Sequence, residues 1–328
     1  MNKKKYAYLD LKEEIESKIR LYGGWVNTHA HIDRAYSITK KNAIHIHSTL
    51  QEKWFLNDEL KRRSSVSEIY DRMAYAVESM ISQGVQALGS FIDIDEVIKD
   101  KAIKAAEKIR EKYKSNIKIC YINQTLKGVI EKKARYWFDY GSEFVDIIGG
   151  LPGKDKGREG EHLDIVLSTA KELHKMAHIH VDQLNTAAER ETELLAWKTL
   201  EHDMVGNVVA IHGVSISAHP MRYKKVLYEF LKKAQLFLIT CPSAWIDSRR
   251  TEELAPTHNA IAPVEELAAE KITVALGTDN IFDIYKPFSD GNMWNELRFL
   301  LEACHYYDTS ELAKIASING LKVLKLHA

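Results

Sequence analysis

The chain has 328 residues, of which 45% are hydrophobic and 28% charged, a composition typical of a folded enzyme and not of a disordered, fibrous or disulfide-stapled protein. Its 46 Lys and Arg residues balance its 46 Asp and Glu residues, so no overall charge recruits nucleic acid or an anionic membrane surface. No apolar run is long enough to cross a bilayer, and the opening MNKKKYAYLDLKEE lacks a secretory core, so we expect a cytoplasmic protein without membrane or nucleic-acid partners.

The cysteine content restricts the kinds of site that the chain can build. Cys120, Cys241 and Cys304 are odd in number and share no short spacing, which argues against a disulfide framework and against a thiolate zinc site. Any metal is therefore expected to be held by histidine and carboxylate side chains.

The first predicted element is a helix from Asp10 to Tyr22. Asp10 is a suitable N-cap, Ile15 and Ile19 have helical spacing, and Gly23 gives a stop signal. The rest of the chain alternates short β-rich apolar runs with longer segments of helical period, a pattern typical of βα units around a parallel sheet. Eight strands are predicted, at residues 25–28, 85–92, 117–123, 144–149, 177–182, 207–212, 235–241 and 272–278.

Helical segments separate these strands and close the chain. They are predicted at residues 67–83, 96–113, 161–175, 187–201, 221–233, 261–271, 292–305, 310–316 and 319–327. Eight parallel strands, each followed by a helix, can close into a (β/α)8 barrel of the TIM type, so the predicted fold class is α/β. We expect residues 1–328 to form a single barrel domain, with residues 1–24 as an N-terminal helical extension. Residues 33–64 and 240–259 are expected to be loops over the barrel mouth.

Polar residues follow several strands at the end where barrel enzymes carry their reactive groups. His29 and His31 end the first strand and, being two apart in an extended segment, project to the same side. His180, His212 and Asp279 stand near the ends of the fifth, sixth and eighth strands. One strand-end histidine is ordinarily a surface or core residue, but four strands that bring His or Asp to one rim indicate a metal site.

Histidine and carboxylate ligands suit zinc or ferrous iron. An ion with an open coordination position lowers the pKa of its bound water to about 7, which makes hydroxide available at neutral pH. In this interpretation Asp279 accepts the proton of that water. The sequence therefore predicts a metal-dependent hydrolase.

The chain resembles the amidohydrolase superfamily, and within it the cytosine deaminase-like branch, over nearly its whole length after residue 24. The resemblance is carried by the HxH of the first strand and by the ordered runs NQTLKG, IIGGLPG, HIHVDQLN, AIHGVSISAH and GTDNIFDIYKPFSDGNM. It implies a small heterocyclic substrate. It also implies that the metal ligands are His29, His31, His180 and Asp279.

The resemblance assigns further roles. His212 matches the catalytic residue that polarises or protonates the reacting centre, and Gln124 matches a contact to a substrate amide. The fourth strand ends in Gly149 and Gly150 and offers no lysine for a carbamylated two-metal site. We therefore expect one divalent metal, with zinc favoured and iron as the alternative.

Two departures from the cytosine deaminases change the expected substrate. Gln183 stands where those enzymes have a proton-shuttling Glu, and a Gln side chain cannot shuttle protons at neutral pH. Asn280 stands where they have a second Asp after the eighth strand. Both residues resemble those of the N-isopropylammelide aminohydrolases, which remove an alkylamine from a hydroxylated triazine.

Two more residues are substrate-binding candidates. Arg34 follows His31 by three positions, where a cation beside the metal could stabilise an anionic ring; the competing interpretation is a surface salt bridge. Tyr285 occupies the position of a family Trp, so it can stack on a flat heterocycle, more weakly than the Trp.

The predicted function is hydrolysis of an exocyclic carbon–nitrogen bond on an amino- or alkylamino-substituted triazine or pyrimidine. Two alternatives stay open: a deaminase of cytosine, a pterin or a related base, and a catalytically silent binding protein. Many amidohydrolases carry a β-sandwich beside the barrel, and with only 24 residues before the first strand we expect it to be absent. Without it, one flank of the barrel would be exposed, and we expect a second subunit to cover that flank, which predicts a homo-oligomer. The expectation is motivated by an apolar stripe near the C-terminus, formed by Leu321, Val323, Leu324 and Leu326.

Overall fold

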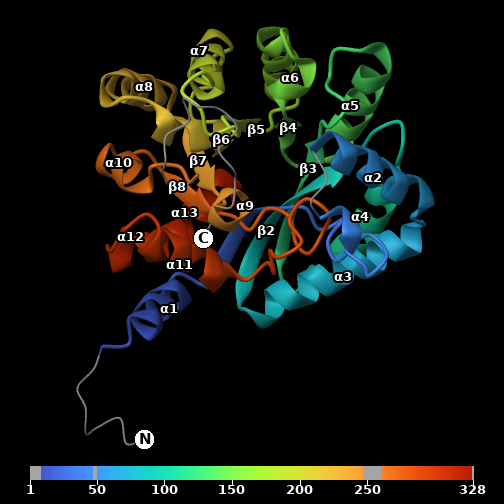
Figure 1. Cartoon of the computed structure of the whole chain (residues 1–328), viewed down its shortest axis with the longest axis horizontal. Helices are drawn as coiled ribbons and strands as arrows, with labels where there is room; N and C mark the ends of the chain where they lie inside the picture. The colour runs from blue at the N-terminus through green and yellow to red at the C-terminus, as the bar shows by residue number, and fades with distance from the viewer. Residues whose placement is uncertain (1–8, 47–49, 247–259, 327–328) are drawn as a thin grey trace, which may run out of the picture.

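The computed structural model describes residues 9–46, 50–246 and 260–326. Within these residues eight strands run in parallel, in chain order around a barrel (Figure 1). They are β1 (Trp25–Ala30), β2 (Val85–Asp93), β3 (Lys118–Gln124), β4 (Ile148–Gly150), β5 (Ala177–Val181), β6 (Val208–His212), β7 (Phe237–Thr240) and β8 (Val274–Leu276).

The strands form two parallel ladders that meet at both edges. β1, β2 and β3 pair in one ladder, and β4 to β8 pair in the other. Single parallel bridges, Ile122 with Ile147 and Ala30 with Asp279, join the two ladders and close the circle. The fold is therefore the (β/α)8 barrel that the sequence predicts.

Helices surround the strands (Figure 1). They are α1 (Leu11–Leu21), α2 (Leu50–Arg63), α3 (Val66–Ser82), α4 (Lys101–Tyr113), α5 (Lys132–Phe144), α6 (Glu159–Glu172), α7 (Glu191–Glu201), α8 (Met221–Ala234), α9 (Pro242–Trp245), α10 (Val264–Ala269), α11 (Met293–Glu302), α12 (Thr309–Ile315) and α13 (Ile318–Val323). Short 3-10 turns are η2 (Ala43–His45), η3 (Pro152–Asp155) and η4 (Val214–Ala218). In the part of the chain that is described, none of these helices has both the length and the apolar character needed to span a bilayer.

Local chemistry sets where several helices begin. The Asp10 side chain accepts a hydrogen bond from the Glu13 backbone N–H, as an N-cap should. Ser65 and Glu68 form a reciprocal capping box at the start of α3. At the start of α7, the Asp182 carboxylate accepts hydrogen bonds from the first backbone N–H groups of the helix, those of Glu191 at 2.7 Å and Thr192 at 3.3 Å.

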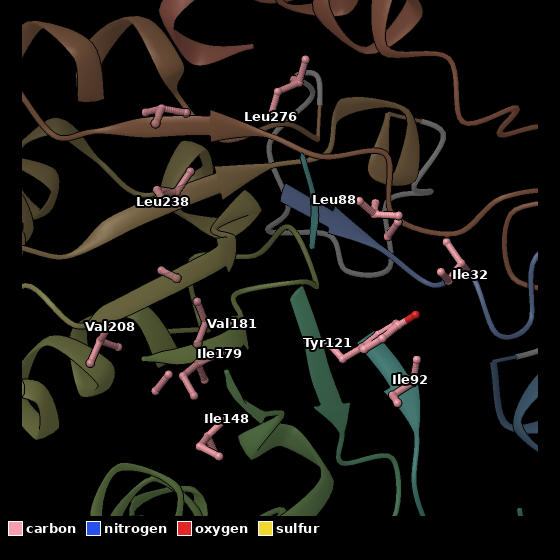
Figure 2. Close-up of a cluster of buried hydrophobic side chains, with 14 of the residues drawn as sticks. Ile32, Leu88, Ile92, Tyr121, Ile148, Ile179, Val181, Val208, Leu238 and Leu276 are labelled. Atoms are coloured by element: carbon pink, nitrogen blue, oxygen red, sulfur yellow. The ribbon is translucent and has the colours of Figure 1, made fainter. Parts of the chain in front are cut away.

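The apolar core has two layers, because strand residues alternate in direction. An outer layer lies between strands and helices, and Figure 2 shows part of it, including Leu88, Tyr121, Ile179 and Leu238. An inner layer fills the barrel with residues such as Phe91 and with side chains of the α13 region. This inner layer is the floor beneath the strand ends.

The apolar residues of the C-terminal segment do not form the exposed flank that the sequence analysis expects. Leu321, Val323 and Leu324 are at most 4% exposed and pack into the inner layer, and Leu326 is partly buried against it. The reason is that α13 lies against β1 and β8 and uses its apolar face within the chain. The argument from these residues to a second subunit is therefore wrong, and the homo-oligomer stays a prediction without it.

Some predicted boundaries are also wrong. The expected loop at residues 33–64 contains α2, and the expected strand at residues 144–149 begins four residues late because Phe144 ends α5. The sequence analysis leaves α5 unassigned. In the second expected loop, at residues 240–259, α9 follows β7 directly, and residues 247–259 lie outside the described part of the chain.

Candidate metal centre

Four histidines and one carboxylate meet at the C-terminal ends of the strands. His29 Nε2 and His31 Nε2 lie 3.2 Å and 3.1 Å from Asp279 Oδ1. The ring of His29 is also 5.0 Å from that of His180 and 5.4 Å from that of His212, between centroids. Two sets of three possible ligands result, His29 with His180 and His212 and His29 with His31 and Asp279, and within each set the ligand atoms lie within 4.8 Å of one another.

The protonation states of this cluster suit a cation. Burial, together with neighbouring positive groups, lowers the pKa of His31 and of His212 to about 3 and that of His180 well below its ordinary value. The imidazoles are therefore neutral at neutral pH and have a lone pair to offer. Burial opposes ionisation of Asp279, but hydrogen bonds from His29 and His31 hold the pKa of its carboxyl well below the usual range.

Backbone geometry aims two of these side chains into the site. His212 has φ 76° and Asp279 has φ 58°, in the left-handed region that non-glycine residues seldom adopt. In both cases the chain turns sharply at the end of a strand. Such strain persists only where the surroundings hold it, and it is common at functional sites.

Asn27 joins β1 to the segment after β8, next to the cluster. Its Nδ2 donates to Thr278 Oγ1 at 2.8 Å, and its Oδ1 accepts the backbone N–H groups of His29 and Thr278. The backbone N–H of Asp279 in turn donates to the His29 carbonyl at 2.9 Å. These bonds fix the position of Asp279 relative to His29 at the edge where the bridge between Ala30 and Asp279 joins the two ladders.

Side chains of β2 and β5 support the cluster from the barrel interior. The ring of Phe91 lies 4.6 Å from that of His180 and 5.0 Å from that of His29, so an apolar ring separates the histidines from the barrel interior. One pleat below His180, His178 Nε2 lies 2.8 Å from the Val323 carbonyl of α13. His178 is thus a packed interior residue.

The donor set fits one divalent ion. His180 Nδ1 lies 3.3 Å from the Gly150 carbonyl, which orients the ring, while His180 Nε2 is buried and has no hydrogen-bond partner among the described residues. A buried ring nitrogen without a partner among these residues, next to the neutral imidazoles of His31 and His212 and an ionised carboxylate, is what an ion of the zinc or ferrous type requires. His29, His31, His180 and Asp279 would hold such an ion, with His212 beside it.

A layer of paired charges lies next to this cluster. Arg34 is buried and its guanidinium forms ion pairs with Asp93 at 3.2 Å and Asp283 at 3.3 Å. Lys61 of α2 forms ion pairs with Asp93 at 3.1 Å and Asp95 at 2.6 Å. Burial opposes ionisation of Asp93, but Lys61 and Arg34 hold the pKa of its carboxyl at about 2.

The arrangement changes the role of Arg34 that the sequence suggests. Arg34 is not on the surface, and its charge is already matched by two carboxylates. It lies over the ring of Tyr285, 5.3 Å from the centroid, while Asp283 accepts the backbone N–H groups of Tyr285 and Lys286. Arg34 therefore supports the loop that carries Tyr285 instead of presenting a free cation.

The sequence analysis missed Asn27, Lys61, Asp93 and Asp95. Asp93 ends β2 at the reactive rim, so the strand-end rule that selected His180 could have found it. Lys61 could not be assigned to the rim because the sequence predicts a loop where α2 lies. A buried Asn in a strand, as at position 27, is a signal that only the structure makes visible, because burial is not written in the local sequence.

The other candidate residues lie at the same rim and differ in whether their polar atoms have hydrogen-bond partners. Gln124 ends β3, and its Oε1 is buried without a partner among the described residues. Gln183 is partly buried after β5. Asn280 donates its Nδ2–H to Asp283, which leaves its Oδ1 for other contacts, and the Tyr285 hydroxyl is buried and unpartnered within the described chain.

Comparisons with known proteins agree with this fold. A model of the Amidohydrolase family matches residues 21–328. An uncharacterised protein of Haemophilus influenzae is 53% identical over 263 residues, which cover 79% of this chain and 95% of that protein. An N-isopropylammelide isopropyl amidohydrolase of Pseudomonas sp. (strain ADP) is 25% identical over 293 residues, which cover 86% of this chain and 69% of that protein.

Solved structures with the same fold include two enzymes. A 5-methylcytosine deaminase from Klebsiella pneumoniae, liganded with phosphonocytosine, superposes with a TM-score of 0.84 at 21% identity and covers 92% of this chain and 75% of its own. An N-isopropylammelide isopropylaminohydrolase from Burkholderia multivorans superposes with a TM-score of 0.76 at 14% identity and covers 92% of this chain and 74% of its own.

Proposed function

The chain belongs to the amidohydrolase family and is a hydrolase that acts on carbon–nitrogen bonds, and from this premise we propose that it removes an exocyclic amine or alkylamine from a triazine or pyrimidine ring. The observation that carries the proposal is the convergence of His29, His31, His180, His212 and Asp279 at one rim, where two sets of three ligands share His29. A ring substrate would bind between this cluster and the amides of Gln124 and Gln183.

The proposed reaction consumes one water. His29, His31, His180 and Asp279 would hold a divalent ion, with zinc favoured and iron as the alternative, and this ion would supply Lewis acidity and a water whose pKa is lowered to about 7. The water oxygen forms a bond to the ring carbon, and the bond from that carbon to the exocyclic nitrogen breaks. One water proton goes to the leaving nitrogen, and the other stays on the product oxygen or moves to a ring nitrogen as the oxo tautomer.

Asp279 and His212 have different roles in the proposed proton transfers. Asp279 is ionised, so it accepts the water proton and returns it to the leaving nitrogen. His212 is neutral, so its N–H donates to the oxygen that gains negative charge during attack. Both groups belong to the same buried cluster, which excludes bulk water from these transfers.

The amides set the choice of substrate in this proposal. Gln183 has no titratable proton at neutral pH, so the ring need not be protonated by the enzyme. Gln124, whose Oε1 has no partner in the described part of the chain, and Gln183 pair with ring N–H and C=O groups. They reject rings that leave these amides without partners. Asn280 and Tyr285 form the β8 side of the pocket, and Arg34 supports them. The N-isopropylammelide amidohydrolase among the relatives supports an alkylamine as the leaving group.

The test is a substrate screen with the metal defined. Protein loaded with zinc or ferrous iron is given N-isopropylammelide, cytosine, 5-methylcytosine and a pterin, and released alkylamine and ammonia are measured. We expect alkylamine release that a chelator abolishes and added metal restores, and a loss of about 100-fold or more in Asp279→Asn. Ammonia from cytosine without any alkylamine would instead assign a deaminase, and no metal-dependent turnover of any ring would contradict the proposal.

A paired substitution tests the role of Gln183. In Gln183→Glu we expect cytosine deamination to appear and alkylamine release to fall, because a carboxyl can shuttle a proton to the ring. Gln235→Glu makes the same charge change at an exposed position before β7, at the opposite end of the barrel, and should leave both activities unchanged. Unchanged activities in Gln183→Glu would show that Gln183 does not set substrate choice.

A further inference from the structure

Trp245 borders the metal centre from the β7 side. It ends α9, which follows β7 directly, and its ring lies 5.3 Å from that of His212 between centroids, at 71°. His212 belongs to the histidine cluster, so the indole stands one ring away from the possible metal ligands. The two rings meet edge to face, which leaves an aromatic wall beside the reacting centre.

The wall is held in place from two sides. The Glu296 carboxylate of α11 accepts the backbone N–H of Ser243 at 2.9 Å and also the Ser243 hydroxyl, which anchors α9. On the β8 loop, Lys286 Nζ lies 5.2 Å from the centroid of the Trp245 ring. A ring with an anchored backbone, an aromatic neighbour and a cation neighbour has little freedom to turn away from the site.

The indole also carries a hydrogen-bond donor that the described residues do not satisfy. Trp245 Nε1 is buried and has no acceptor among them, and the same holds for the Tyr285 hydroxyl on the adjoining loop. Native proteins seldom leave a buried donor without an acceptor, and where they do, a ligand is a ready explanation. Indole is a donor only, so the missing partner must be an acceptor. The positive charge of Lys286 near the ring favours an electron-rich acceptor.

We propose that Trp245 is a specificity-determining residue, whose indole N–H donates a hydrogen bond to an oxo group of the bound heterocycle and so selects oxo-substituted rings. The inference rests on the proposed function, because it takes the occupant of the site to be a nitrogen heterocycle. It adds that the ring carries an oxo group on the flank that faces β7, in addition to the carbon that loses the amine.

Binding measurements test this inference without requiring turnover. Zinc-loaded protein is titrated calorimetrically with uracil, which has two oxo groups, and with 4-pyrimidinone and 2-pyrimidinone, which each lack one of them. We expect the wild type to bind uracil about tenfold more tightly than one of the two mono-oxo rings, as one hydrogen bond to a buried donor would give. Trp245→Phe keeps the aromatic wall without the N–H, and we expect it to bind uracil only as tightly as that mono-oxo ring.

A matched variant and the remaining outcomes complete the test. Trp197→Phe makes the same chemical change on α7, at a residue that is 52% exposed and packs on Phe230, and should leave all three affinities unchanged. If Trp245→Phe binds every ring as the wild type does, the inference is wrong and the proposed function stands. If its affinity for all three rings falls equally, the indole acts as a wall and not as a donor, which also overturns the inference. If the wild type binds none of the three rings, no oxo group is recognised on this flank and the inference is wrong, whereas the substrate screen described above decides the proposed function separately.

Discussion

Buried polar side chains at the barrel mouth divide into two groups, according to whether the protein satisfies them. Arg34, Lys61 and Asp93 are matched with one another, so removing one would leave a buried charge without its partner. His180 Nε2, Gln124 Oε1 and Trp245 Nε1 have no partner among the described residues. The first group maintains the shape of the mouth, and the second group is available to an ion and a substrate.

Lys154, at the same rim, is a lysine whose charge is disfavoured by burial. Lys154 of η3 lies with its Nζ 3.0 Å from the centroid of the Trp54 ring. Burial, and then the neighbouring charges of Lys127 and Lys61, lower its pKa from 10.5 to about 7. Between these two pH values the unfolded chain binds a proton that the folded chain does not, so the folded state gains stability as the pH rises through this window.

Replacing Lys154 should therefore stabilise the protein only at the lower pH. Lys154→Met is expected to raise the free energy of unfolding by about 1 kcal/mol at pH 6, after allowance for solvent screening, and by much less at pH 9. Urea denaturation at both pH values measures the difference. Lys133→Met, at a side chain that is 85% exposed, is the control and should show no such dependence. An equal effect of Lys154→Met at pH 6 and pH 9 would mean that the pKa of Lys154 is not lowered in the folded state.

At the scale of elements, the close approach of α13 to β1 is a packing constraint on the metal centre. A Cβ added at Gly320 would lie 2.6 Å from Val26 Cγ1 and 3.0 Å from Thr28 Cγ2. Val26 and Thr28 precede His29 on β1, so the helix determines where that strand can lie. Glycine is needed here for space and not for an unusual backbone angle.

Two glycine substitutions test this constraint. Gly320→Ala is expected to lower the free energy of unfolding by about 1–3 kcal/mol through overpacking, although alanine favours helix. Gly160→Ala in α6, where the nearest atom to a new Cβ outside the local helix backbone is Lys198 Cε at 3.8 Å, should be at least as stable as the wild type. Chemical denaturation of both variants measures the contrast. If Gly320→Ala is also neutral, α13 can shift without cost and does not constrain β1.

At the scale of the whole molecule, the candidate metal site links the two ladders of the barrel. His29 and His31 come from the β1 edge, whereas His180, His212 and Asp279 come from the ladder of β4 to β8. Among the described residues, the backbones of the two ladders meet at the bridges of Ile122 with Ile147 and of Ala30 with Asp279, together with a few neighbouring hydrogen bonds such as that from the Asp279 N–H to the His29 carbonyl. An ion at this position would therefore hold together the seam of the barrel.

Metal removal should destabilise the entire fold. Zinc at about 1,000 times its Kd is expected to add about 4 kcal/mol to the free energy of unfolding, because the ion binds the folded state. The thermal midpoint should rise by several degrees on zinc addition and fall again with a chelator. His180→Ala should lose this zinc-dependent shift, whereas His305→Ala, at an exposed position after α11, should retain it. A midpoint of the wild type that does not respond to zinc would count against the metal site.

The fold class and the grouping of the polar strand ends can be predicted from the amino-acid sequence. Alternation of short apolar strands with helical segments is a local pattern, and the rule that strand C-terminal ends meet at one rim then groups His29, His180 and Asp279 without coordinates. Boundaries were less reliable: α2 was taken for a loop, and β4 was placed four residues early, because local periodicity does not show which surface a segment packs against.

Which polar groups already have a hydrogen-bond or ion-pair partner cannot be predicted from the sequence and becomes clear in the folded structure. Arg34 could be free or paired on the sequence alone, and its ion pairs with Asp93 and Asp283 depend on residues 59 and 249 positions away along the chain. The burial of Leu321 within the chain, and the lack of an acceptor for Trp245 Nε1 among the residues that the structure describes, are likewise outcomes of packing. The physical reason is that pairing and burial depend on distances in space, and contacts between residues far apart in sequence are set by the whole fold.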